Sequence, residues 1–244
     1  MKLYIIGNGF DLAHNLPTRY SDFKEYVRNH NAELFSELNN IYGENDLWSD
    51  FEKALGHPNK EYIDKPDKVF GIKNIIGREF ANDIKNELGS WISTIKYNFI
   101  QKQFDLSDED LYLSFNYTDT LNAVYRINDK RIKFIHGFVA KHFFGEHLII
   151  GHNNNCFDGY ELIENTYKDT DLIIKQNKEW FDKLLGKRIK NIIVIGCSYN
   201  DIDIVYFKEI KKRLPNANWK LTVKTKNDEK QRDKYIKDLE ITNN

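Results

Sequence analysis

Short apolar runs recur along the 244-residue chain, and most of them are continuous rather than alternating with polar residues. Continuous runs of this length are typical of strands that are buried on both faces of a parallel sheet. We therefore expect six strands, at Leu3–Ile6, Leu111–Phe115, Lys133–His136, Leu148–Gly151, Ile192–Ile195 and Trp219–Val223.

Helical patterns separate several of these runs. The segments Asp201–Arg213 and Asp228–Leu239 follow the last two predicted strands, which makes the C-terminal third of the chain βαβα. This order predicts an α/β fold with a Rossmann-like, doubly wound parallel sheet and helices on both of its faces.

The interval between the first two predicted strands is too long for a simple crossover and shows only helical periodicity. Apolar residues share one helical face in Leu47–Leu55, and they recur every three or four residues from Val69 to Phe99. We therefore expect one α/β domain over residues 1–244, with residues 17–110 as a helical insertion subdomain after the first βα unit.

Composition limits the function classes. Lys and Arg total 36 against 37 Asp and Glu, which argues against a nucleic-acid coat or a polybasic membrane anchor. Only two cysteines are present, Cys156 and Cys197, so a disulfide-stapled mini-domain and a four-thiolate zinc site are excluded. The chain has no membrane-spanning apolar run, and Gly7 interrupts the first run too early for a signal peptide. A cytoplasmic protein without a metal is expected.

Glycines mark one edge of the predicted sheet. Gly7, Gly9, Gly137, Gly151 and Gly196 each follow an apolar run closely. Glycine at the C-terminal end of a strand lets the backbone turn sharply and lets a ligand approach it. This pattern indicates a binding edge at the carboxyl ends of the strands.

The first of these turns is Gly7-Asn8-Gly9-Phe10-Asp11, between a buried strand and a predicted helix start. Backbone N–H groups at such a turn form an anion cradle that favours a diphosphate. The third glycine of the dinucleotide fingerprint is absent, so the two glycines are also compatible with a tight turn alone.

Asn116 follows the second predicted strand, and His136 is the last residue of the third. Asn116 can cap a helix or offer its amide to sugar hydroxyls. His136 can accept a proton near neutral pH, although in isolation a lone core histidine is the better interpretation. His152 repeats the arrangement one strand later, which makes a metal conceivable, but no tight His, Asp and Glu spacing supports one.

The turn after the fifth predicted strand runs from Gly196 to Asp203. Gly196 and Ser198 suit contact with an adenosine ribose, while Asp203 also suits the N-terminus of the following helix. Cys197 is a weak candidate nucleophile because no paired base accompanies it. Glu52, in the Leu47–Leu55 pattern, is a candidate second polar group, with an exposed helix charge as the simpler interpretation.

Together these motifs resemble the AbiH family of bacterial abortive-infection proteins. The matching stretches cover most of the chain in order, and the first is the longest and most specific. They are Ile5–Phe23 (IIGNGFDLAHNLPTRYSDF), Leu47–Leu55 (LWSDFEKAL), Phe115–Leu121 (FNYTDTL), Ile135–Gly137 (IHG) and Ile195–Asp203 (IGCSYNDID).

AbiH proteins are in turn similar to sirtuin-type NAD-binding domains. This resemblance implies a single sirtuin-like α/β domain, and it implies a role for the residues of each matching motif. The glycine loop would hold the diphosphate, Asn116 the ribose near the scissile bond, and His136 would be the catalytic base. Ser114 and Thr118 depart from the Thr-x-Asn-x-Asp motif of those proteins. The cofactor-binding set implied is Gly7, Asn8, Gly9, Phe10, Asp11, Gly196, Ser198 and Asp203.

The resemblance implies an anti-phage effector that hydrolyses the N-glycosidic bond of NAD, that is, an NAD glycohydrolase. The zinc-binding cysteines of deacetylating sirtuins are missing, so protein deacetylation is not expected. Two alternatives stay open: a non-catalytic sensor of NAD or an ADP-ribose-type nucleotide, and an interaction protein in a phage-defence system, acting as a homo-oligomer or with a partner protein.

Overall fold

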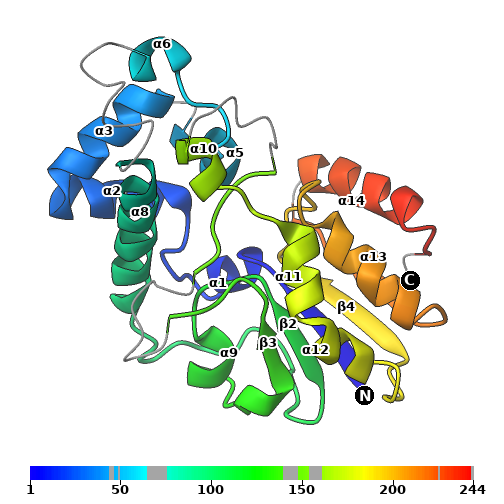
Figure 1. The fold of residues 1–244 in the computed structure, drawn as a ribbon. Helices are drawn as coiled ribbons and strands as arrows, with labels where there is room; N and C mark the ends of the chain where they lie inside the picture. Colours follow the sequence, from blue (N-terminus) through cyan, green and yellow to red (C-terminus); the bar gives the residue numbers. More distant parts are fainter. Residues whose placement is uncertain are drawn as a thin grey trace. The chain divides into compact units, whose positions relative to one another are not determined.

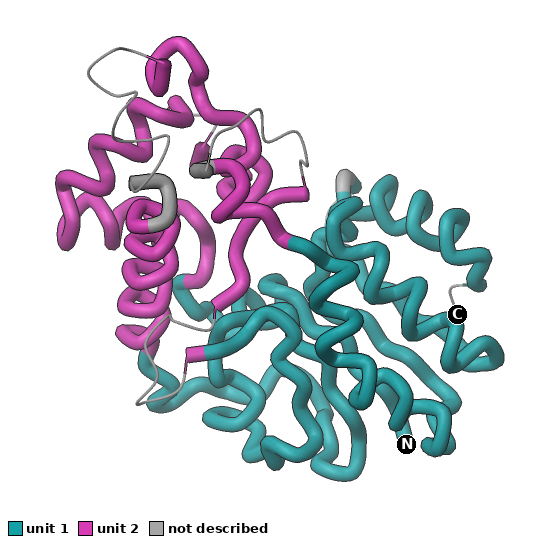
Figure 2. Tube along the Cα trace, viewed as in Figure 1, with its two compact units in different colours: residues 1–17, 96–138, 169–244 teal, residues 18–95, 139–168 magenta. Residues whose placement is uncertain are grey.

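The computed structural model describes residues 1–43, 47–48, 50–64, 76–139, 148–153, 161–224 and 226–242. The chain divides into two compact units, and each is built from segments that are far apart in the sequence (Figure 2). Unit 1 comprises residues 1–17, 96–138 and 169–244, and unit 2 comprises residues 18–95 and 139–168.

Unit 1 contains a five-stranded sheet of order β3-β2-β1-β4-β5 in which all strands are parallel (Figure 1). β1 is the central strand, and its four apolar residues Leu3–Ile6 are buried. The predicted Rossmann-like α/β fold is therefore confirmed. The strands are β1 (Lys2–Ile6), β2 (Leu111–Ser114), β3 (Ile132–Phe134), β4 (Asn191–Ile195) and β5 (Asn218–Leu221).

Helices cover both faces of this sheet because side chains alternate between the faces along each strand. On one face, Tyr4 and Ile6 pack with Phe10 and Leu121. On the other face, Phe207 stacks on Trp219 of β5. The helical elements of unit 1 are α1 (Gly9–Ala13), α9 (Thr120–Ala123), the 3-10 turn Asp129–Arg131, α11 (Thr170–Gln176), α12 (Lys178–Lys183), α13 (Ile204–Arg213) and α14 (Lys226–Asp238).

The two predicted C-terminal helices are present as α13 and α14. α13 begins three residues later than expected, because residues 201–203 form turns before Ile204. No described helix combines the length and the apolar character that a membrane crossing requires.

The predicted strand at Leu148–Gly151 is wrong. This segment belongs to unit 2, and only an isolated bridge joins the next residue, His152, to Tyr167. Leu148 and Ile150 are buried, so this apolar run reflects a buried segment and not a strand of the sheet. A side chain on Gly151 would overlap the carbonyl oxygen of Thr166, so close backbone packing explains this glycine.

Unit 2 is helical and has an aromatic core. Phe23 contacts Trp48, Phe51 and Trp91 with ring centroids 5.2–6.1 Å apart. Leu47 and Leu55 are buried as well, which confirms the single apolar face predicted for Leu47–Leu55. Its described helices are α2 (Tyr20–His30), α3 (Ala32–Tyr42), α5 (Phe51–Ala54), α6 (Lys60–Ile63), α8 (Ile76–Ser93) and α10 (Glu161–Asn165).

The long helical pattern from Val69 to Phe99 is only partly realised. α8 spans Ile76–Ser93, and residues 65–75 lie outside the described part of the chain. Phe99 does not belong to the apolar face, because it is 99% exposed with a φ of +64°. Hydrophobic spacing alone does not indicate that the helix has already ended at Ser93.

Candidate functional site

The strand order places a topological switch point between β1 and β4. From β1 the sheet grows through β2 and β3 on one side, and through β4 and β5 on the other. Open α/β sheets bind ligands outside the carboxyl ends of the strands at such a point. The loops that occupy it are the two that the glycine pattern singled out, Gly7-Asn8-Gly9 after β1 and Gly196-Cys197-Ser198 after β4.

Glycine is required here because the two loops touch through their backbones. The Gly9 N–H donates to the Gly196 carbonyl at 2.8 Å, and a Cβ on Gly7 would lie 2.6 Å from that same oxygen. Gly196 has a φ of +72°, and a side chain there would overlap the backbone of Gly9 and Phe10. The N–H groups of Gly7 and Phe10 also donate within the protein, to Ile195 and Gly7. The diphosphate cradle therefore stays a prediction.

The side chains of the first motif divide into exposed and buried ones. Asn8 is exposed at the N-cap of α1, whereas Phe10 is buried in the core against Phe104. On the second loop Ser198 is exposed. Asn8 and Ser198 are therefore the predicted binding side chains that lie on the surface beside the switch point.

Asp11 is the centre of a buried polar network. Its side chain is 0% exposed, and its carboxylate accepts from Thr118 Oγ1 at 2.5 Å and from Thr120 Oγ1 at 2.7 Å. Asn116 Nδ2 donates to the same carboxylate at 3.1 Å. Burial raises the pKa of Asp11 to about 6, and the three hydrogen bonds oppose part of that rise.

Asn116 connects the loop after β2 to the loop after β1. Its Nδ2 donates to the Gly7 carbonyl at 3.1 Å as well as to Asp11, and its backbone N–H donates to Ser114 Oγ at 3.2 Å. The helix that follows has Asp119 at its N-cap position, so the amide of Asn116 is not a capping group for α9. The structure thus brings three predicted site residues, Gly7, Asp11 and Asn116, into direct contact.

His136 lies at the end of β3 and is buried, with 2% of its surface exposed. Its Nε2 is 3.2 Å from the hydroxyl of Tyr206 on α13, and its ring stacks on Phe115, the neighbour of Asn116. His152, in contrast, follows no strand of the sheet, so the idea of two histidines at one sheet edge is not supported.

The loop after β4 contains the remaining candidates. Cys197 is half-buried, and burial raises the pKa of its thiol well above the ordinary value, which keeps it protonated and poorly nucleophilic. Tyr199 has a φ of +57° and donates to the carbonyl of Thr222 at 2.7 Å. Asp203 is half-buried at the N-cap position of α13, where it makes no side-chain capping bond.

Sequence reasoning missed several residues that support these groups. Thr120 lies in the Phe115–Leu121 motif but is not among the predicted site residues, and it donates to Asp11. Tyr97 accepts from the Asp119 N–H and Tyr206 contacts His136, and no local motif connects these two tyrosines to the site. A second network has the same character: His14 Nδ1 contacts the Phe10 carbonyl at 2.7 Å, and its Nε2 contacts the Tyr125 hydroxyl at 2.7 Å. Because a carbonyl only accepts, Nδ1 is the donor, and Tyr125 donates to Nε2.

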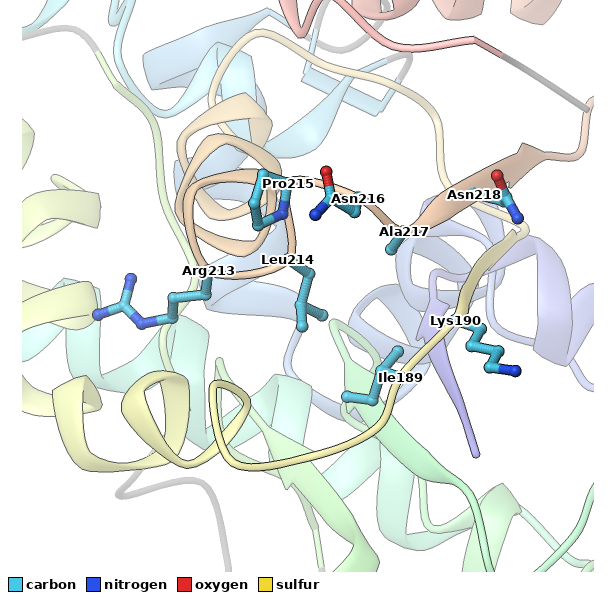
Figure 3. A pocket seen from close by; sticks show the side chains of 8 residues that line it. All are labelled: Ile189, Lys190, Arg213, Leu214, Pro215, Asn216, Ala217 and Asn218. Carbon is cyan, nitrogen blue, oxygen red and sulfur yellow. The ribbon is translucent and has the colours of Figure 1, made fainter.

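A hollow of about 440 Å³ lies at the end of the sheet opposite the switch-point loops, and Figure 3 shows the side chains that line it. Its lining residues precede β4 and connect α13 to β5, with Lys190, Arg213 and Asn216 among them. Arg213 is already paired with Asp182 at 2.7 Å. This hollow therefore lies apart from the switch-point loops and the Asp11 network.

The fold and the glycine-lined switch point define a Rossmann-like α/β protein with its candidate site at the carboxyl edge of a parallel sheet. The family model described as "Bacteriophage abortive infection AbiH" matches residues 3–79 and 71–224. The chain belongs to the AbiH family, and its role is therefore in phage abortive infection. No curated protein matches the chain.

Proposed function

We propose that this AbiH protein acts in abortive infection by hydrolysing the N-glycosidic bond of NAD. One observation carries the proposal: the Asn116 amide, after β2, donates at 3.1 Å to the carbonyl of Gly7, in the β1 glycine loop that borders the switch point. A dinucleotide at that point would place a ribose against the amide and its phosphates near the loops after β1 and β4. Depletion of a shared cofactor would stop the host before phage mature.

The reaction uses one water. The bond between C1′ of the ribose and the nicotinamide nitrogen breaks, and its electron pair leaves with nicotinamide. The water oxygen bonds to C1′, which has oxocarbenium character as the bond breaks. His136 takes the proton that the water loses, with Tyr206 orienting its ring, and Asn116 orients the ribose hydroxyls. The products are nicotinamide, ADP-ribose and one proton.

The test is release of nicotinamide from NAD, followed by chromatography of the purified protein with and without phage components. We expect Asn116→Ala and His136→Ala to lower the rate, the latter by ~10²–10⁴-fold because a general base is lost. Asn216→Ala makes the same chemical change as Asn116→Ala on an exposed residue at the opposite end of the sheet and should leave the rate unchanged. If both variants release nicotinamide as fast as the wild type, the roles proposed for Asn116 and His136 are wrong.

A non-catalytic nucleotide sensor is the second candidate, and the burial of His136 favours it. A base that is 2% exposed has little access to water, and the amides of Gly7, Gly9 and Phe10 already donate within the protein. If the protein is a sensor, we expect NAD or ADP-ribose to bind and to protect it from thermal unfolding, and no nicotinamide to be released. Turnover by the wild type that both variants abolish would exclude it.

A further inference from the structure

The feature that the proposed mechanism leaves unexplained is the buried carboxylate of Asp11. It receives three hydrogen bonds, from Asn116, Thr118 and Thr120, and all three donors are neutral. Among the described residues no cation forms an ion pair with it. Burying a charge without a countercharge is expensive, and an apolar side chain of similar size would cost the fold less.

The hydrogen bonds determine which way the Asn116 amide points. Its Nδ2 has two protons, and the two atoms facing it, the Gly7 carbonyl oxygen and Asp11 Oδ2, only accept in the ionised state. The amide nitrogen must therefore face them, and the amide oxygen must face the other way. In the described part of the chain Oδ1 of Asn116 has no hydrogen-bond partner, and it is not sealed from solvent.

We propose that Asp11 is a positioning residue: it holds the amide of Asn116 so that Oδ1 is presented to the ligand as a hydrogen-bond acceptor. The ligand group that such an atom recognises is a hydroxyl donor, as on a ribose, and not a phosphate or carboxylate. This inference rests on the proposed function for the identity of the sugar, and it changes the role predicted for Asp11. The carboxylate acts behind Asn116 instead of contacting the nucleotide.

Without Asp11 the amide keeps only the Gly7 carbonyl as a partner, so it can turn and present its NH₂ group instead of its oxygen. A ligand hydroxyl would then lose its acceptor, whereas a ligand that lacks that hydroxyl would lose nothing. The Asp11 side chain therefore determines discrimination between ribose and deoxyribose. If Asp11 served folding alone, its replacement would weaken the binding of both ligands equally.

Three variants separate these roles. Asp11→Leu removes the carboxylate that accepts from Asn116 and replaces it with an apolar side chain of similar volume. Asp11→Asn keeps one carbonyl oxygen, which can still accept from Asn116 and Thr118, while the hydroxyl of Thr120 can accept from the new NH₂ group. Asp110→Leu is the matched control, because Asp110 is also buried in unit 1 but precedes β2 and accepts from the Lys2 N–H at 2.7 Å.

The first measurement is binding, by calorimetry, of NAD and of analogues lacking the 2′- or 3′-hydroxyl of the nicotinamide ribose. It is made in a His136→Ala background, in which turnover should be ~10²–10⁴-fold slower. We expect one analogue to bind ~10–100-fold more weakly than NAD. The ratio of the two dissociation constants should fall towards one in Asp11→Leu. Asp11→Asn and Asp110→Leu should keep the ratio of the parent protein. Equal weakening of all ligands by Asp11→Leu, or no discrimination in the parent protein, would overturn the proposal.

The second measurement needs no ligand. In ¹⁵N NMR spectra the side-chain NH₂ signal of Asn116 is assigned by its loss in Asn116→Ala. We expect its exchange with water to be at least ~10-fold faster in Asp11→Leu than in the parent protein or in Asp11→Asn. Unchanged exchange would refute the positioning role. If exchange responds as expected while neither NAD nor its analogues bind, the positioning role stands and the proposed function fails.

Discussion

Unit 1 has a buried carboxylate and unit 2 has a half-buried one, and the two are stabilised in different ways. In unit 1, Asp11 is wholly buried and surrounded by the neutral donors Asn116, Thr118 and Thr120. In unit 2, Glu52 accepts from the buried Lys168 at 3.2 Å and from the Tyr20 hydroxyl at 2.7 Å.

The difference has a physical consequence. A cation offsets the charge of Glu52, whereas neutral donors offset only part of the desolvation of Asp11, whose pKa rises to about 6. A cation partner, as Lys168 is for Glu52, is the usual arrangement for a charge that is withdrawn from water. A buried carboxylate left with a perturbed pKa is more typical of a functional site.

The largest effect is expected at the loop contact of unit 1, compared with a glycine of unit 2. Gly196 and Gly43 both have a positive φ, +72° and +76°, but only Gly196 has backbone atoms where a side chain would go. Gly196→Ala should lower the free energy of unfolding by about 4 kcal/mol or more, and Gly43→Ala by about 1–2 kcal/mol from backbone strain alone. Urea unfolding of both variants measures this. Similar losses would show that the contact between the two loops is not tight in solution.

The next effect concerns the ion pair of unit 2. Glu52→Ala leaves the Lys168 amine, whose side chain is 2% exposed, without the Glu52 carboxylate, so we expect a loss of about 3 kcal/mol in unfolding free energy. Glu179→Ala is the control, because Glu179 and Lys183 form a solvent-exposed pair on α12, and its removal should change the free energy of unfolding far less. If Glu52→Ala proves as mild as the control, Lys168 is rehydrated when its partner is removed.

The pH dependence of stability should distinguish Asp11 from the ion pair. Its folded pKa of about 6 lies above the ordinary 3.8, so between these values the folded state binds more protons than the unfolded state. Asp11 therefore lowers stability as pH rises from 4 to above 6, by up to about 3 kcal/mol. Tyr97, which faces the network, has its pKa raised by burial and stays neutral over this range. Urea unfolding of the wild type should show this fall, and Asp11→Asn should not. Parallel profiles would contradict the prediction.

The sequence was informative about the sheet and less so about the connections around it. Five of the six predicted strands exist, because continuous apolar runs beside β1 report burial on two faces. The sixth, Leu148–Gly151, has the same composition but is buried in unit 2. A four-residue run contains too little periodicity to distinguish a strand from any other buried segment.

The candidate site divides in the same way. The glycine turns, Asn116 and His136 could be found because each lies at the C-terminal end of a predicted strand. The burial of Asp11 could not, because its donors lie 105 to 109 residues away along the chain. Likewise, Tyr206 reaches His136 across 70 residues, and no local signal connects the two.

By itself the sequence determined the class of fold, the carboxyl edge of the sheet as the place of the candidate site, and the AbiH membership. It could do so because buried strands and glycine turns are local patterns. Only the tertiary structure decided that Gly7, Gly9 and Gly196 serve contact between two loops, and that the Asp11 carboxylate is buried against Asn116, Thr118 and Thr120. The physical reason is that burial and hydrogen-bond direction depend on which distant segments meet. The same Gly-Asn-Gly-Phe-Asp motif would present its carboxylate to solvent if Asn116, Thr118 and Thr120 did not cover it.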